Sequence, residues 1–296
     1  MRFLHLGYDM PLYRPPSEAN SLILQLTIGC SWNKCAFCEM YKAKKFRIRT
    51  EEEIEEEIEF LATYDTDVRR VFFADGNAMV LSADKLLRII DKIHANFPKV
   101  HRISAYALPK DILSKSEEDL KALKEAGLNL LYVGIESGDD ELLEKVNKGE
   151  TYESTLISLL KAKQAGIKLS LMVINGLGGK KYSFQHALNS AKLINEIQPE
   201  YVSTLVLSFP TGEKKYAEHF NGDYESMTKI DLIQEMEVFL EHSDLNCSIF
   251  RSDHASNYLV LKGILGRDKG RLLMQVKKAI SNPHLVELKE EWQLGF

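Results

Sequence analysis

The sequence predicts an α/β protein with a parallel sheet, followed by an α-rich C-terminal extension. Apolar runs alternate with amphipathic helical segments at a regular pace over the first 210 residues. Each run is apolar at nearly every position, which is typical of a strand that helices cover on both faces. Strands joined by helices run parallel, because the helix returns the chain to the edge where the strand began. An open doubly wound sheet, a barrel and part of a barrel all fit this pattern, and periodicity alone does not choose among them.

Six strand-then-helix units make up the predicted core. The strands are expected over residues 21–29, 69–76, 101–108, 128–137, 168–176 and 200–209. Thr50 begins a capping-box pattern, Ser82 and Ser116 have the chemistry of N-caps, and Gly127 and Gly166 end helices. The later helices of the core are expected over 140–146, 151–165 and 184–197.

After Phe209 the alternation stops. Pro210, Gly212 and Gly222 interrupt the chain, and helices are predicted over 228–242 and 268–281. We therefore expect two parts. Residues 1–210 would form the core with an N-terminal arm, and residues 211–296 an extension packed over that core.

Composition and charge exclude several classes of protein. The chain has 296 residues and a net charge of −5, which argues against a broad nucleic-acid surface. Its apolar runs are all shorter than the roughly 18 residues of a membrane-spanning helix, so no membrane partner is expected. Residues 1–16 lack the apolar segment of a secretory signal. We expect a cytoplasmic protein.

A basic stretch precedes a strongly acidic one. Six of the seven residues from 51 to 57 are Glu, which favours a solvated helix face over a metal site. The basic residues are Lys42, Lys44, Lys45, Arg47 and Arg49. They could bind phosphates, but pairing with the acidic helix is the simpler expectation.

The cysteines are the most informative residues. Three of the four, Cys30, Cys35 and Cys38, fall within nine residues directly after the first strand. Three thiolates on one loop can hold three irons of a [4Fe–4S] cluster and leave one iron open. A structural zinc site would need a fourth ligand, and no His lies within 15 residues after Cys38. Cys247 is far away, and we expect it to be a small buried apolar residue.

This loop resembles that of the radical S-adenosylmethionine (SAM) superfamily. The usual spacing there is C-x3-C-x2-C with an aromatic residue just before the third Cys. The spacing here is C-x4-C-x2-C, and Phe37 takes the aromatic place. The extra residue affects the expected path of the loop more than the set of ligands.

Further segments resemble the family in the correct order after successive strands. Residues 74–77 follow the second strand, where the main chain of the family's Gly-Gly-Glu-like motif receives the amino group of SAM. Residues 134–138 look like a segment shared by coproporphyrinogen dehydrogenase, radical methylthiotransferases and elongator-type tRNA-modifying enzymes. Residues 176–179 follow the fifth strand, where the family supports adenine. The expected cofactor-binding residues are Phe37, Ala74, Asp75, Gly76, Ser104, Tyr106, Glu136 and Gly176, with Cys30, Cys35 and Cys38 as metal ligands.

Each of these side chains could instead have a purely structural role. Glu136 could form a structural ion pair, Asp75 could be a turn residue, and Ser104 and Tyr106 could make core contacts.

The resemblance implies a (β/α)6 partial TIM barrel with its site at the carboxyl ends of the strands. It implies a [4Fe–4S] cluster and SAM as cofactors, and an oxygen-sensitive enzyme. Reductive cleavage of SAM would give methionine and a 5′-deoxyadenosyl radical, which abstracts hydrogen from a small or medium organic substrate. The expected partners are that small-molecule substrate and a reductant protein such as flavodoxin or ferredoxin.

Substrate choice is expected to come from residues 251–258, the densest polar segment of the extension. The segment is either a polar turn or a lid over the barrel mouth. As a lid it would supply His254 as an acid or base and Tyr258 as a hydrogen donor, and we name both as candidate catalytic residues.

Two other functions stay open. The first is radical SAM chemistry on tRNA, although residues 211–296 show no added RNA-binding module, so a nucleic-acid partner is not expected. The second is a non-catalytic binding protein stabilised by zinc or by a cluster.

Overall fold

A computed structural model describes residues 8–209 and 212–295 of the chain. The chain divides into two compact units. The first comprises Met1–Asn33, Cys38–Val133 and Ile157–Leu169, and the second comprises Lys34–Phe37, Gly134–Leu156 and Ser170–Phe296. The predicted boundary at residues 210–211 lies outside the described residues, and the predicted division into core and extension stays a prediction.

The first unit is built on parallel strands. Their order is β1 (Leu22–Gln25), β4 (Arg70–Ala74), β5 (Arg102–Tyr106) and β6 (Leu128–Glu136), of which the last three residues belong to the second unit. Every pair is parallel, as the apolar runs predicted. Phe72 lies beside Ser104, and Tyr106 beside Tyr132. These residues share one face of the sheet, because alternate residues of a strand point the same way.

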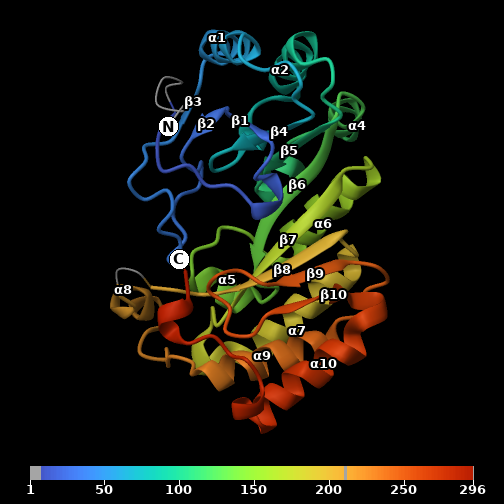
Figure 1. Ribbon diagram of the computed structural model, residues 1–296. Helices are drawn as coiled ribbons and strands as arrows, with labels where there is room; N and C mark the ends of the chain where they lie inside the picture. The colour runs from blue at the N-terminus through green and yellow to red at the C-terminus, as the bar shows by residue number, and fades with distance from the viewer. Residues whose placement is uncertain (1–7, 210–211, 296) are drawn as a thin grey trace. The chain divides into compact units, whose positions relative to one another are not determined.

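Helices cover the other face of these strands (Figure 1). They are α1 (Glu51–Ala62), α2 (Ala83–Asn96), α4 (Glu117–Glu125) and α6 (Tyr152–Gln164), with the short α3 (Pro109–Leu113) after β5. The predicted caps are confirmed: Thr50 and Ser116 form capping boxes, and the side chain of Ser82 accepts a hydrogen bond from Lys85 N. Such caps stabilise a helix by about 1 kcal/mol each.

A short ribbon frames the cysteine loop. Strands β2 (Thr27–Ile28) and β3 (Arg47–Ile48) pair antiparallel, and residues 30–38 lie in the connection between them, without helix or strand. The ribbon therefore brings the two ends of the loop together within the first unit.

The second unit continues with β7 (Lys168–Asn175), β8 (Tyr201–Val206), β9 (Ile249–Ser252) and β10 (Leu261–Ile264). The β7–β8 and β8–β9 pairs are parallel and the β9–β10 pair is antiparallel. Helices α7 (Gly179–Ile197), α9 (Lys229–His242) and α10 (Leu265–Ser281) lie side by side against these strands (Figure 1). The shorter helices are α5 (Asp140–Lys145) and α8 (Lys214–Ala217).

Three local expectations need correction. The single strand expected over residues 21–29 is two strands, β1 and β2, which belong to different sheets. Strands β9 and β10 form a hairpin on either side of the polar segment. No strand was predicted there, because strands of four residues give little periodic signal. Helix α7 begins at Gly179, five residues before the predicted start. The prediction placed the start too late because Gly178 and Gly179 are weak helix formers. Along the described part of the chain, no helix is long and apolar enough to cross a membrane.

Candidate cluster and cofactor site

The three cysteines occupy a loop that both units share. Cys30 and Cys38 belong to the first unit and Cys35 to the second. All three thiols are partly exposed and none forms a disulfide. Within residues 8–209 and 212–295, no three His, Cys, Asp or Glu side chains are gathered closely enough to enclose a metal ion.

Asp75 fastens both ends of this loop to the end of β4. Its side chain is fully buried, and its Oδ2 accepts hydrogen bonds from Gln25 Nε2, Gly29 N and Lys44 Nζ, each at 2.9 Å. Gly29 precedes the first cysteine and Lys44 follows the third. A buried carboxylate is costly unless it is paired, and these donors pair it. The Asp75 side chain thus has a structural task, and contact of SAM with its main chain stays a prediction.

Gly76 allows the loop to approach β4 closely. A Cβ atom at this position would overlap Gly29 O and the Cα atom of Cys30. The neighbouring Asp75 has a positive φ of 63°, so the strand turns sharply there. A side chain at residue 76 would displace the backbone of the first cysteine.

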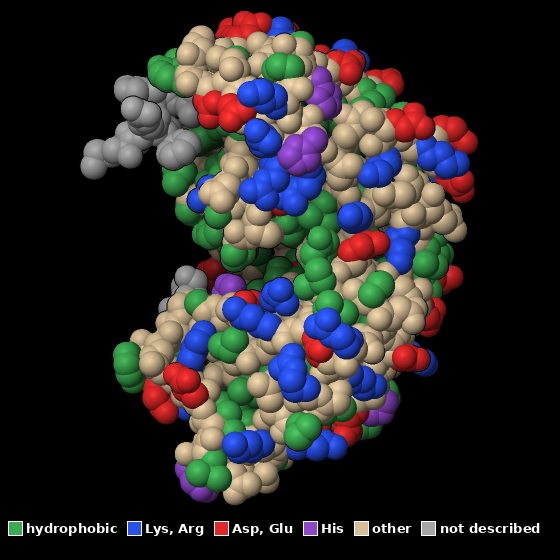
Figure 2. All heavy atoms as spheres, turned by 45° about the vertical axis from the view of Figure 1, so that its right-hand side comes forward, with side chains coloured by type: hydrophobic (Ala, Val, Ile, Leu, Met, Phe, Trp, Pro, Cys, Tyr) green, Lys and Arg blue, Asp and Glu red, His purple; other side chains and the backbone are tan. Residues whose placement is uncertain are grey.

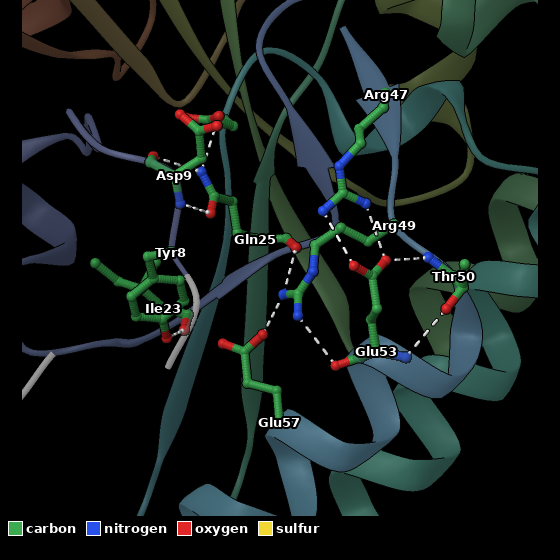
Figure 3. A network of polar contacts seen from close by, with 10 residues as sticks. Tyr8, Asp9, Ile23, Gln25, Arg47, Arg49, Thr50, Glu53 and Glu57 are labelled. Atoms are coloured by element: carbon green, nitrogen blue, oxygen red, sulfur yellow. Dashed lines mark hydrogen bonds and ion pairs between the residues drawn. The ribbon is translucent and has the colours of Figure 1, made fainter. Parts of the chain in front are cut away.

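The basic stretch pairs with the acidic helix only in part. Arg47 forms two hydrogen bonds with Glu53 at 2.9 and 3.0 Å, and Arg49 pairs with Glu57 (Figure 3). The predicted pairing therefore holds for these two arginines. It is wrong for Lys44, which pairs with Asp75 instead.

Gln25 connects Asp75 with Asp9, near the N-terminus. Its amide exchanges two hydrogen bonds with the main chain of Asp9, at 3.0 and 3.1 Å (Figure 3). Lys44 Nζ donates to the same residue's carbonyl at 2.6 Å. The main chain at Asp9 thereby packs against Gln25 and Lys44, the two side chains that bind Asp75.

Ser104 and Tyr106 occupy the sheet face opposite the helices of the first unit. Ser104 is fully buried, and its Oγ donates to Val71 O at 3.4 Å. The Tyr106 ring packs edge-on against Phe72 and Tyr132, with centroids 5.0 and 6.2 Å away. These contacts account for both residues as core positions, and their proposed contact with SAM stays a prediction.

Tyr41 is a residue that the sequence did not single out. It is buried, and its pKa is raised by burial first and then by the nearby Tyr106, Asp75, Cys38 and Cys30. A phenol that stays neutral beside these groups supplies a hydrogen-bond donor without adding charge. Only its place three residues after the last cysteine could have pointed to it.

Glu136 ends β6 with a carboxylate that is only partly satisfied. The residue is 7% exposed with φ 63°, and its Oε1 accepts from Lys148 Nζ at 3.0 Å. Its Oε2 is buried and has no hydrogen-bond partner among the described residues. The carboxylate folds back over Gly134, where a Cβ atom would overlap Oε1. A buried carboxylate oxygen without a donor suits a ligand that brings one.

Phe37 is anchored in the second unit. Its ring packs against a core cluster of Leu142, Val146, Ile174, Leu177, Tyr182, Tyr216 and Phe220. Lys148 Nζ lies 6.0 Å from the ring centroid, and Ala36 N donates to Val146 O at 2.9 Å. This stretch of the loop is therefore docked beside α5, and the predicted contact of Phe37 with SAM stays a prediction.

Gly176 directly follows β7 in a left-handed conformation with φ 84°. A Cβ atom there would come within 2.6 Å of Leu232 Cδ2 on α9. Its N–H donates to Glu235 Oε1 at 2.6 Å. The close approach of α9 requires a glycine at this position.

The polar segment after β9 is fastened to the end of β8. Ser256 Oγ and Asn257 Oδ1 both accept from Val206 N, at 3.1 and 2.9 Å. Tyr258 lines a small pocket with Asn175 and Val206, the last residues of β7 and β8. The segment therefore lies at the carboxyl ends of these parallel strands.

His254 lies at the surface of this segment, with its Nδ1 2.9 Å from Ser256 Oγ. Partial burial of the ring, and then the charge of Lys289, lower its pKa. A lower pKa favours the neutral imidazole. Because Ser256 N donates to Nδ1 at 3.2 Å, the ring proton is on Nε2.

Cys247 is exposed, so the expectation of a buried residue is wrong. It precedes β9 in a connection at the surface, where a thiol packs against little.

The residues present fit the two cofactors that the resemblance implies. Three thiols on one loop are the donor set for a cluster with one open iron. Glu136 Oε2 offers a buried acceptor that the described residues leave unused.

Comparison with known proteins agrees with this chemistry. The profile of the Radical SAM superfamily matches residues 24–194. The heme chaperone HemW of Bacillus subtilis is 30% identical over 131 residues, 44% of this chain and 35% of that protein. The tRNA-2-methylthio-N(6)-dimethylallyladenosine synthase of Chloroherpeton thalassium is 26% identical over 285 residues, 94% of this chain and 61% of that protein. The chain spans less than two thirds of the length of either relative.

Solved structures show the same fold. Coproporphyrinogen III oxidase (HemN) from Escherichia coli, a radical SAM enzyme, matches with a TM-score of 0.55 and 19% identity, covering 75% of this chain and 52% of that one. The cobalamin-dependent SAM radical enzyme OxsB matches with a TM-score of 0.53 and 16% identity, covering 93% of this chain and 38% of that one. These likenesses confirm the predicted fold class.

Proposed function

This chain belongs to the radical SAM superfamily, and we propose that it cleaves SAM reductively to abstract hydrogen from a small or medium organic substrate. As an enzyme of this superfamily it uses a [4Fe–4S] cluster and SAM. The observation that carries the proposal is the set of three thiols on one loop, whose two ends Asp75 fixes to β4. A structural zinc site would need a fourth ligand instead.

Each residue has a defined task in this proposal. Cys30, Cys35 and Cys38 hold the cluster, and the main chain of residues 74–76 and the carboxylate of Glu136 bind and orient SAM. When bound, the cluster and SAM would supply the one-electron chemistry that removes a hydrogen atom from the substrate. Burial of Glu136 keeps its carboxylate away from competing water.

The reaction needs a small-molecule substrate and an electron donor. We propose flavodoxin or ferredoxin as the donor. We further propose that the part of the polar segment after β9, residues 253–258, contacts the substrate, because it is fastened to the carboxyl end of β8. His254 and Tyr258 of this segment are the proposed catalytic residues.

Iron analysis tests the ligand set. Anaerobic reconstitution should load about four irons and four sulfides per chain. Changing Cys30, Cys35 or Cys38 to Ala should abolish this loading, while Cys247→Ala, on an exposed thiol, should leave it unchanged. Full occupancy in Cys35→Ala, or zinc in place of iron, would overturn the assignment.

Chemistry on tRNA is the second candidate. The match to the tRNA-modifying synthase covers 94% of this chain, which favours it. Against it, the net charge is −5, and Lys and Arg side chains are scattered among acidic and hydrophobic ones on the face in Figure 2. Comparing a deletion strain with its parent separates the two. A lost nucleoside in digested tRNA supports this candidate, and a changed small metabolite supports the first.

A further inference from the structure

A buried glutamate from α9 holds the carboxyl end of β7. Glu235 is 3% exposed, and its Oε1 accepts from Gly176 N at 2.6 Å and from Asn175 Nδ2 at 2.9 Å. Asn175 Nδ2 also donates to Leu232 O at 3.1 Å. One carboxylate oxygen thus satisfies both the main chain and the side chain where the strand ends.

The same strand end is connected to the end of β6 through a histidine. His186 Nε2 donates to Ile174 O at 3.0 Å, so its Nδ1 is the acceptor for the hydroxyl of Ser137 at 2.8 Å. Glu235 Oε1 lies 3.8 Å from His186 Nε2. A buried polar layer therefore runs behind residues 136–137 and 174–176 of the second unit.

We propose that Glu235 is a positioning residue that fixes Asn175 and Gly176 in the conformation that binds the nucleoside of SAM. This inference rests on the proposed function and on the expectation that Gly176, directly after β7, contacts the adenine of SAM. Gly176 is in the left-handed region and closely packed on Leu232, so its N–H has little freedom to find another acceptor. Without Glu235, a buried donor at the end of β7 would be unpaired, and the strand end would open to regain water.

Glutamine at position 235 should hold Asn175 and Gly176 as well as glutamate does. The hydrogen bonds to Asn175 and Gly176 are made by Oε1, and the Ser183 side chain also contacts the carboxyl group. Burial raises the pKa of Glu235, which favours the neutral acid that Gln resembles. Leucine has a similar size but no acceptor.

The test compares Glu235→Gln with Glu235→Leu in the reconstituted full chain. Equilibrium titration with SAM should give a dissociation constant near the wild-type value for Glu235→Gln and about tenfold higher for Glu235→Leu. Iron content should be unchanged in both. In protein without cofactors, hydrogen exchange in a peptide spanning residues 172–179 should accelerate for Glu235→Leu only.

Two controls separate positioning from general destabilisation. Gln234→Leu changes the exposed neighbour on α9 and should alter neither readout. Met236→Ala removes a buried side chain that lines two small pockets with Asn175 but makes no hydrogen bond to Gly176 N. It should lower the melting temperature with little effect on SAM affinity.

Equal SAM affinity in Glu235→Leu and wild type would overturn the positioning role, as would an equal loss in Met236→Ala at a matched melting temperature. If wild-type protein with a full cluster does not bind SAM at all, the proposed function itself is wrong. The hydrogen-exchange comparison still decides whether Glu235 orders the end of β7.

Discussion

At the scale of single residues, Lys44 and Asp75 form the contact on which the cysteine loop depends most. Lys44 is 6% exposed and Asp75 is fully buried, so each charge relies on the other and on nearby polar atoms. Removing one partner of a buried pair typically costs about 3–5 kcal/mol, because the remaining charge stays in a dry site.

Lys44→Met should therefore lower the free energy of unfolding by about 3–5 kcal/mol and reduce iron loading. Denaturant titration of the protein without iron and iron analysis after reconstitution measure the two effects. Lys45→Met is the matched control, since Lys45 is exposed, and it should change stability by less than about 0.5 kcal/mol. Equal effects of the two substitutions would show that the buried pair does not hold the loop.

Gly134 controls the position of the Glu136 carboxylate. Gly134→Ala places a methyl group where Oε1 now lies, and a flexible side chain will move before the backbone does. We expect SAM affinity to fall about tenfold or more with iron content unchanged, as loss of one charged hydrogen bond would produce. Calorimetric titration with SAM measures this.

Gly270→Ala is the control for Gly134→Ala, because a Cβ atom there meets nothing within 4 Å. It should leave SAM affinity unchanged. Unaltered affinity in Gly134→Ala would mean that Glu136 is only a structural partner of Lys148.

The contacts that the sequence did not reveal share one property. Gln25 and Asp75 are 50 positions apart, and Gly176 and Glu235 are 59 positions apart. No local period connects such pairs, so a polar residue inside an apolar strand is the only sequence signal at Gln25. The cysteines could be predicted because three metal ligands on one loop are close in sequence by necessity.

At the scale of elements, the long helices and strands could be predicted and the short hairpin could not. The core strands have continuous apolar runs, and the helices begin at Thr50, Ser82 and Ser116, whose caps act within a few residues. Strand β9 is defined by its parallel pairing with β8, about 50 residues earlier, and this partner is invisible to local pattern. That pairing places the polar segment at the end of β8.

The segment after β9 gives a prediction at this scale. His254→Ala and Tyr258→Phe should retain iron content and slow, uncoupled cleavage of SAM, and lose most turnover of the substrate found by metabolite comparison. The reason is that the segment is fastened to β8 by Ser256 and Asn257, and these changes remove neither of their hydrogen bonds to Val206 N. His284→Ala, on an exposed histidine, is the control. Normal turnover in both variants would reduce the segment to a structural turn.

At the scale of the whole molecule, the order of the cysteine loop and the strand-end segments along the chain supports membership of the superfamily most strongly. The cysteine loop follows β1 and β2, and residues 74–76, 136 and 176 lie at or directly after the ends of β4, β6 and β7. The match of the superfamily to residues 24–194 covers all of these segments. This order does not determine the substrate: the chain spans only part of its relatives, and these include both a heme chaperone and a tRNA-modifying synthase.

We propose above that this protein cleaves SAM at a cluster held by three cysteines. The most direct test of this proposal is to add dithionite and SAM anaerobically to reconstituted protein and to measure 5′-deoxyadenosine by chromatography. We predict slow formation of 5′-deoxyadenosine without substrate, and none in Cys30→Ala, Cys35→Ala or Cys38→Ala. Intact SAM in the presence of a fully formed, reduced cluster would contradict the claim.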